Sequence, residues 1–288
     1  MSGYKSIGKS IDWITATAKP KSEGFSALYK FAKGFVEDRA KQYGALIDPW
    51  SFYGYQGFII RENGHLAYGE RTEQGNLIQA GGDLASQSWP KIAGVADNIT
   101  RFDICVDVLL NQEDTTIAKV CYDWVKQSKV GVRNRKYGLI QGNTGDTLYV
   151  GSRKSTQFGR VYDKSGQMGL AAGRIWRYEL ELKGKPAYQM ANTLLEKCGR
   201  AEDDPKSLGK AIVNTVYHWF SDRMVEPLFE HNGKGIAVST VRATTALDQK
   251  LTWLRKQVRP SVLALISRGY EQEVIDALGL MLLLDEMR

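Results

Sequence analysis

The spacing at which hydrophobic residues recur changes along the chain, and it predicts strands and helices in mixed order. Residues 11–18 form a β-rich run, which predicts a strand. Apolar residues then recur at helical spacing from Phe25 to Phe35, and Gly44 is a suitable stop for this first helix. Residues 50–80 combine aromatic and branched side chains with turn sequences, which predicts a hairpin-type meander.

The second half of the chain begins with strands and ends with helices. The predicted strands are 99–110, 136–141, 146–151, 158–164 and 175–183. The predicted helices are 117–125 with Asp114 as N-cap, 187–197, 208–221 and a final helical block at 246–287. This order predicts an α+β fold, a mainly antiparallel sheet core with helices packed on it and a helical C-terminal segment. We expect one large domain over residues 1–245 and the helical segment over 246–288.

Charge adds a partner class to this picture. The 288 residues carry 39 Lys and Arg against 32 Asp and Glu, a net charge of +7. Residues 126–164 alone hold nine of the cations and two of the acids, so the whole excess lies in one block. A localised basic block is typical of nucleic-acid binding. The DNA-contacting cations that we expect from it are Arg133, Arg135, Lys136, Arg153 and Lys154.

Several classes of protein are disfavoured because their sequence motifs are missing. The three histidines, His65, His218 and His231, are too far apart for a histidine-pair metal motif, and no Walker or GxSxG motif is present. No window approaches 18 consecutive apolar residues, so no membrane span is expected. Three cysteines without CxxC spacing suggest reduced thiols and a cytoplasmic protein.

Candidate metal ligands lie on two of the predicted strands. Alternation places Arg101, Asp103 and Asp107 on one face of strand 99–110, with the apolar side chains on the other. Asp103 and Asp107 are about 13 Å apart along a strand, so they cannot share an ion directly. One of them, with a glutamate of a neighbouring strand, either Glu179 or Glu181, could hold Mg²⁺ or Mn²⁺. The alternative is a salt-bridged surface in which Arg101 pairs with Asp103.

Two further strands combine tyrosines with cations. Tyr149 and Arg153 share strand parity, and Arg160, Tyr162 and Lys164 share a face of the next strand. A phenol needs nearby positive charge to attack phosphorus at neutral pH, and arginine and lysine neutralise charge that builds on phosphate oxygens. The alternative is a basic strand of a nucleic-acid binder that performs no chemistry.

Together these motifs resemble the replication initiation factors of rolling-circle plasmids and small filamentous phages. The pieces that carry the resemblance are IDWIT (11–15), TRFDICVD (100–107), TLYVGSRKS with FGRVYDK (147–164) and RYELELK (177–183). The combination of YxGSRxS, RxYDK and RxE is specific, whereas each piece alone is not. The chain departs from the family after YDK, where residues 165–174 lack the acidic residue often found there.

The resemblance implies an enzyme that nicks one strand of a double-stranded origin and rejoins it through a 5′-phosphotyrosine, with Mg²⁺ or Mn²⁺. Tyr162 corresponds to the YDK tyrosine and is the expected nucleophile, with Tyr149 in reserve. Asp103 and Glu179 correspond to the metal carboxylates, and Arg153, Arg160 and Lys164 would hold the phosphate. Single-stranded DNA and a host helicase are the further partners implied.

Other interpretations remain open from the sequence. The first is a non-catalytic, sequence-specific DNA-binding protein of a phage or plasmid. A tyrosine recombinase is disfavoured because the centre of the chain is β-rich and histidines are scarce. The helical C-terminal segment either binds duplex DNA or forms a homodimer interface.

Overall fold

Two compact units make up the chain, residues 1–239 and residues 240–288. The computed structural model describes residues 6–110, 117–127, 137–141, 146–165, 174–198, 205–223, 225, 227–238 and 259–277. In the second unit it describes two short helices, α7 (Arg259–Ile266) and α8 (Glu271–Ala277). The residues expected to form a helix before α7 lie outside the described part of the chain.

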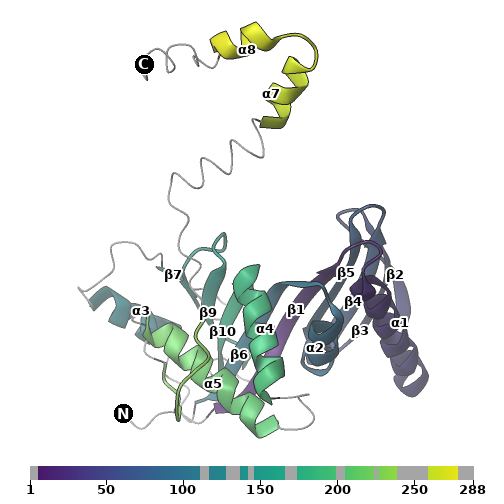
Figure 1. Ribbon diagram of the computed structural model, residues 1–288. Coiled ribbons are helices and arrows are strands. Elements are labelled where there is room, and N and C mark those ends of the chain that lie inside the picture. The colour runs from purple at the N-terminus through teal and green to yellow at the C-terminus, as the bar shows by residue number, and fades with distance from the viewer. Residues whose placement is uncertain are drawn as a thin grey trace. The chain divides into compact units, whose positions relative to one another are not determined.

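The first unit is built on a ten-stranded antiparallel sheet (Figure 1). Its strands are β1 (Ser6–Ala18), β2 (Ile47–Phe52), β3 (Tyr55–Glu62), β4 (Gly64–Arg71), β5 (Gly75–Gly82), β6 (Asn98–Leu109), β7 (Tyr137–Ile140), β8 (Thr147–Val150), β9 (Gln157–Asp163) and β10 (Ile175–Lys183). Their spatial order is β2-β3-β4-β5-β1-β6-β10-β9-β8-β7. The pair β1–β6 therefore joins two meanders at the centre of the sheet, and the predicted antiparallel α+β fold is confirmed.

Five described helices belong to the same unit. They are α1 (Glu23–Tyr43), α2 (Asp83–Val95), α3 (Ile117–Gln127), α4 (Lys185–Cys198) and α5 (Pro205–Ser221). The predicted helix start and stop of α1 are explained by its caps. The Ser22 hydroxyl accepts a hydrogen bond from the backbone N–H of Phe25, and Gly44 ends the helix in the left-handed conformation, with φ of 67°.

Helix α2 was not predicted, because Pro90 lies inside it and proline normally interrupts a helix. Its apolar side, which includes Leu84, Trp89 and Ile92, is fully buried. That burial against the sheet stabilises the helix in spite of the proline. None of the described helices is long and apolar enough to span a membrane.

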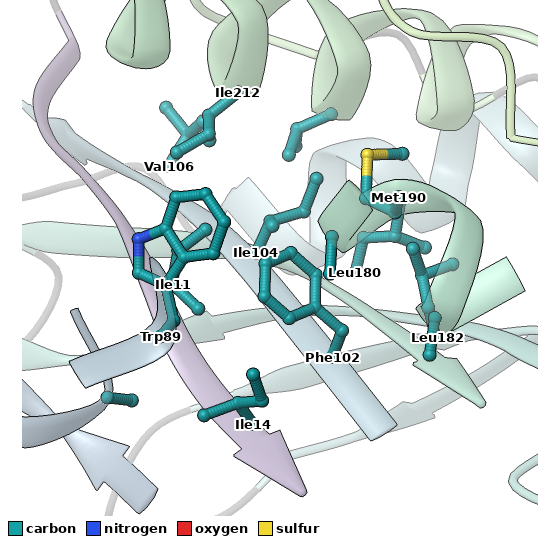
Figure 2. Packing of buried hydrophobic residues seen from close by; sticks show 14 of the residues in the cluster. Ile11, Ile14, Trp89, Phe102, Ile104, Val106, Leu180, Leu182, Met190 and Ile212 are labelled. Carbon is teal, nitrogen blue, oxygen red and sulfur yellow. The ribbon is translucent and has the colours of Figure 1, made fainter. Parts of the chain in front are cut away.

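One face of the sheet packs against the helices and forms the core. Figure 2 shows Phe102, Ile104, Val106 and Leu180 of the central strands packed together with Trp89 of α2, Met190 of α4 and Ile212 of α5. Each fully buried side chain of this size contributes about 1.5–3 kcal/mol relative to exposure. Because side chains alternate along a strand, the residues between these apolar positions point to the opposite face. We call that opposite side of the sheet the polar face.

Candidate functional site

The polar face brings the predicted site residues of four neighbouring strands together. Strand pairing places Asp103 opposite Glu181, Glu179 opposite Arg160, Arg177 opposite Tyr162, and Arg160 opposite Tyr149. Directly paired residues share one face of a sheet. The candidate nucleophiles, cations and carboxylates from β6, β10, β9 and β8 therefore occupy one continuous surface, as the alternation of the sequence predicts.

Asp103 of β6 is buried at the centre of this surface. The Arg101 guanidinium donates to both of its carboxylate oxygens, with Nε at 3.1 Å from each, and also forms an ion pair of 3.0 Å with Glu181. Burial raises the pKa of Asp103 to about 8, against the opposing effect of Arg101 and with help from the negative charges of Glu179 and Glu181. The Arg101–Asp103 pair considered from the sequence is present.

Glu179 of β10 is equally buried and forms an ion pair with Arg160 of β9. Burial of Arg160 by itself lowers the pKa of its guanidinium. The negative charge of Glu179 beside it has the opposite effect, and the pKa of Arg160 is raised above its ordinary value. The Nε atom of Arg160 is buried and has no hydrogen-bond partner within the described residues. An unsatisfied buried donor of this kind is costly, and an anionic oxygen could satisfy it only after the side chains that cover it move aside.

Tyr162 lies next to this pair. The Arg160 guanidinium lies 5.9 Å from the centre of its ring, and Arg177 is opposite on β10. Burial, followed by the negative charge of Glu179, raises the pKa of Tyr162 above its usual value, and the cations do not offset this. The nearby cations that the sequence indicates are present, but the phenol still needs further positive charge or a proton acceptor to react.

Tyr149 lies one strand further along, on β8. Its ring stacks on Phe158 with a centroid separation of 5.6 Å, and the Arg153 guanidinium lies 5.4 Å from the Tyr149 centroid. Arg153 itself follows β8 in an exposed turn together with Lys154. Tyr149 therefore combines an aromatic platform with an accessible cation, whereas Tyr162 belongs to the buried ion-pair cluster.

The remaining predicted residues have different surroundings. Lys164 directly follows β9 and is partly buried. Asp107 accepts two hydrogen bonds from Arg177, at 2.6 and 2.7 Å, and Arg177 also pairs with Asp12 of β1. The three DNA-contacting cations predicted at positions 133, 135 and 136 lie outside the described residues.

Asp12 is the residue of this cluster that sequence reasoning missed. Strict alternation along β1 would put its side chain on the helix side, with the opposite orientation to Trp13. A register irregularity between Ile11 and Trp13 instead lets Asp12 reach Arg177 on the polar face. The sequence signal is an aspartate between Ile11 and Trp13, in the most apolar part of the strand.

The donor chemistry of the cluster suits a hard divalent cation. Asp103 and Glu179 offer buried carboxylate oxygens, which Mg²⁺ and Mn²⁺ prefer. Within the described part of the chain, no group of three or more Asp, Glu, His or Cys side chains is placed to hold an ion. Since Mg²⁺ is commonly bound by one or two carboxylates with waters and substrate phosphates, a two-carboxylate site is compatible with this arrangement.

Comparison with known proteins identifies the family. Residues 97–278 match the family model described as "Replication initiation factor". The match covers well over half of the chain, so the protein belongs to the replication initiation factor family, and the resemblance seen in its motifs is confirmed. The matched region includes β6, β8, β9 and β10, and contains all of α8.

A solved structure is also similar to the chain. It is described as the rolling circle replication initiator protein from Geobacillus stearothermophilus, with 16% identity and a TM-score of 0.47. The similarity covers 78% of this chain and 99% of that one. No curated protein sequence matches the chain.

Proposed function

We propose that the protein initiates rolling-circle replication by nicking one strand of an origin and rejoining it through Tyr162. The observation that carries the proposal is the Arg160 guanidinium 5.9 Å from the Tyr162 ring centre, with a buried Nε that has no partner among the described residues. A scissile phosphate beside Tyr162 would supply the missing acceptor. Such a contact would place phosphorus next to a nucleophilic oxygen.

The reaction is a transesterification. The Tyr162 oxygen attacks the phosphorus and loses its proton, the bond from phosphorus to the 3′ oxygen breaks, and that oxygen takes up a proton. One product end is a 5′-phosphotyrosine and the other a free 3′-OH for a polymerase. The phosphodiester energy is kept in the new bond, so rejoining by the reverse step needs no nucleotide hydrolysis. Arg160, Arg153 and Lys164 would neutralise the phosphate oxygens.

Asp103 and Glu179 would hold the Mg²⁺ or Mn²⁺ ion in this proposal. The ion would supply positive charge close to the phosphate, which the raised pKa of Tyr162 calls for. Binding it requires Arg101 and Arg160 to release at least part of their contacts with the two carboxylates. Asp107 is less suited to this role because Arg177 occupies both of its oxygens.

The proposed partners follow from the reaction. Double-stranded origin DNA and the single strand displaced from it are the substrates, and a host helicase would open the duplex. The helical segment at the C-terminus would supply origin selection or a homodimer contact. We place this activity in the cytoplasm.

A second candidate is a DNA-binding protein without nicking activity. The observation that favours it is the internal pairing of Arg101 with Asp103 and of Arg160 with Glu179, together with the raised pKa of Tyr162. In this alternative the polar face binds phosphates but does not activate a nucleophile.

A nicking assay on a supercoiled plasmid with the cognate origin distinguishes the nicking enzyme from the DNA-binding protein without nicking activity. We expect relaxed or nicked product with Mg²⁺ or Mn²⁺, none with excess EDTA, and none from Tyr162→Phe, while Tyr149→Phe retains activity. Tight binding without product by the unaltered protein would support the second candidate. Normal nicking by Tyr162→Phe and none by Tyr149→Phe would transfer the nucleophile to Tyr149.

A further inference from the structure

A basic cavity lies on the helix side of the sheet, away from the polar face. Its volume is about 320 Å³, and the residues that matter for its chemistry are Lys9, Lys206, Lys210, Glu230, His231 and Asn232. Lys9 is paired with Val106, whose side chain is in the core beneath the helices, so this part of β1 points away from Tyr162. The cavity is therefore separate from the proposed nicking site.

The charges around the cavity are not balanced. Three lysines face one glutamate, and none of the three is within ion-pair distance of a carboxylate in the described part of the chain. Lys206 and Lys210 are also four residues apart on α5, a spacing at which like charges repel. Lys206 occupies the first turn of α5, where the helix dipole disfavours a cation. The arrangement thus opposes folding stability unless an anion joins it.

The walls of the cavity are fixed by specific contacts. Gly209 of α5 leaves room for Lys9, because a Cβ atom there would lie 2.5 Å from the Lys9 Cε. The backbone N–H of Asn232 donates to the side-chain oxygen of Asn214 at 3.1 Å. The His231 ring stacks on Tyr217 with a centroid separation of 3.5 Å. These contacts fix the cavity walls and the Lys9 stem, while all three lysines are solvent-exposed and accessible to a ligand.

We propose that this cavity binds a phosphate group. Several lysine ammonium groups around one cavity are well suited to phosphate, whose oxygens accept charge-assisted hydrogen bonds. The Asn232 amide and His231 supply further polar groups at the rim. The phosphate could come from the backbone of DNA that extends past the nicking site, or from a free phosphorylated molecule. The proposal does not depend on nicking.

The test compares the full-length protein with Lys206→Gln/Lys210→Gln. Inorganic pyrophosphate and a duplex oligonucleotide are each titrated into these two proteins, and binding is measured by calorimetry. Both probes are also titrated into a control variant, Lys30→Gln/Lys33→Gln on α1, which removes the same charge elsewhere. Unliganded melting curves confirm that all variants fold, and Lys206→Arg/Lys210→Arg should restore binding. We expect pyrophosphate affinity to fall about tenfold or more in the cavity variant only.

The two probes identify the source of the phosphate. If oligonucleotide affinity falls in parallel with pyrophosphate affinity, the cavity holds the DNA backbone. If only pyrophosphate affinity falls, its ligand is a free phosphorylated molecule. Equal affinities of the unaltered protein and the cavity variant for both probes would overturn the proposal. Because binding is the readout, a protein that fails to nick can still confirm or refute it.

Discussion

Arg177 illustrates how individual charged residues hold the polar face together. Its buried guanidinium forms ion pairs with Asp107 and Asp12, so removal of the cation would leave two carboxylates without this partner. We expect Arg177→Met to lower the free energy of unfolding by about 3–5 kcal/mol. Denaturant titration measures this, with Arg61→Met as the control.

Arg61 pairs with Asp48 on an exposed part of the sheet, where both side chains are more than half exposed. The control should therefore change stability by about 1 kcal/mol or less. Equal losses in the two variants would contradict the structural role assigned to Arg177.

His65 provides a pH-dependent prediction at the same scale. Burial, and then the positive charge of Arg61, lowers the pKa of His65 below its ordinary value of 6.5. Protonation therefore favours the unfolded chain, and stability should fall as the pH falls below about 6.5. His65→Gln, which can still bond to Gln79, should show a weaker decline between about pH 7 and pH 5. Unchanged pH dependence in this variant would refute the assignment.

Most of the candidate site could be predicted residue by residue. Alternation groups Arg160 with Tyr162 within one strand, and the observed pairing of β6, β10 and β9 brings them to the same face as Asp103 and Glu179. The direction of the Tyr162 pKa shift could not be predicted, since it depends on burial by neighbouring strands. Asp12 was missed because an irregularity of backbone register is not visible in the pattern.

At the scale of elements, the contact between α5 and β9 supports the strand that carries Tyr162. Gly159 lies beneath α5, and a Cβ atom there would collide with the Trp219 ring and lie 2.9 Å from Phe220 Cζ. We expect Gly159→Ala to cost about 1–3 kcal/mol of stability by forcing the helix away. Melting curves measure the loss.

Gly138 of β7 is the matched control, because no atom of the described residues lies within 4 Å of a Cβ built there. Gly138→Ala should leave the melting temperature nearly unchanged. If both alanine variants melt like the unaltered protein, close packing at Gly159 is not important for stability.

The elements themselves were largely predictable, with one clear exception. The strands from β6 to β10 and the helices α1, α3, α4 and α5 follow hydrophobic periodicity. Helix α2 does not, because Pro90 is a local signal against a helix and only tertiary burial of Trp89 outweighs it. Spatial strand order is also not encoded locally, since β1 pairs with β5 and β6 far along the chain.

At the scale of the whole molecule, the localised basic block predicts strongly salt-dependent DNA binding. Arg153 and Lys154 of this block are exposed, and the Arg153 guanidinium lies 5.4 Å from the centre of the Tyr149 ring. Each phosphate contact contributes about 0.7 to the slope of log affinity against log salt for single strands. Arg153→Gln/Lys154→Gln should therefore reduce that slope by about 1.4.

The control for this measurement is Lys30→Gln/Lys33→Gln, which changes the net charge equally but on α1. Its slope should match that of the unaltered protein. Equal reductions in both variants would mean that net charge, and not the placement of the block, determines DNA binding.

The roles of the two chain units stay a prediction, because the helical segment was assigned DNA selection or dimerisation from the sequence alone.

The most direct test of the central claim is to identify the residue left attached to DNA after nicking. A single-stranded oligonucleotide with the origin sequence is nicked with Mn²⁺, digested with nuclease and trypsin, and analysed by mass spectrometry. Trypsin separates residues 161–164, which contain Tyr162, from residues 137–153, which contain Tyr149. We predict the nucleotide adduct on Tyr162. An adduct on Tyr149, or nicked product without any tyrosine adduct, would contradict the account.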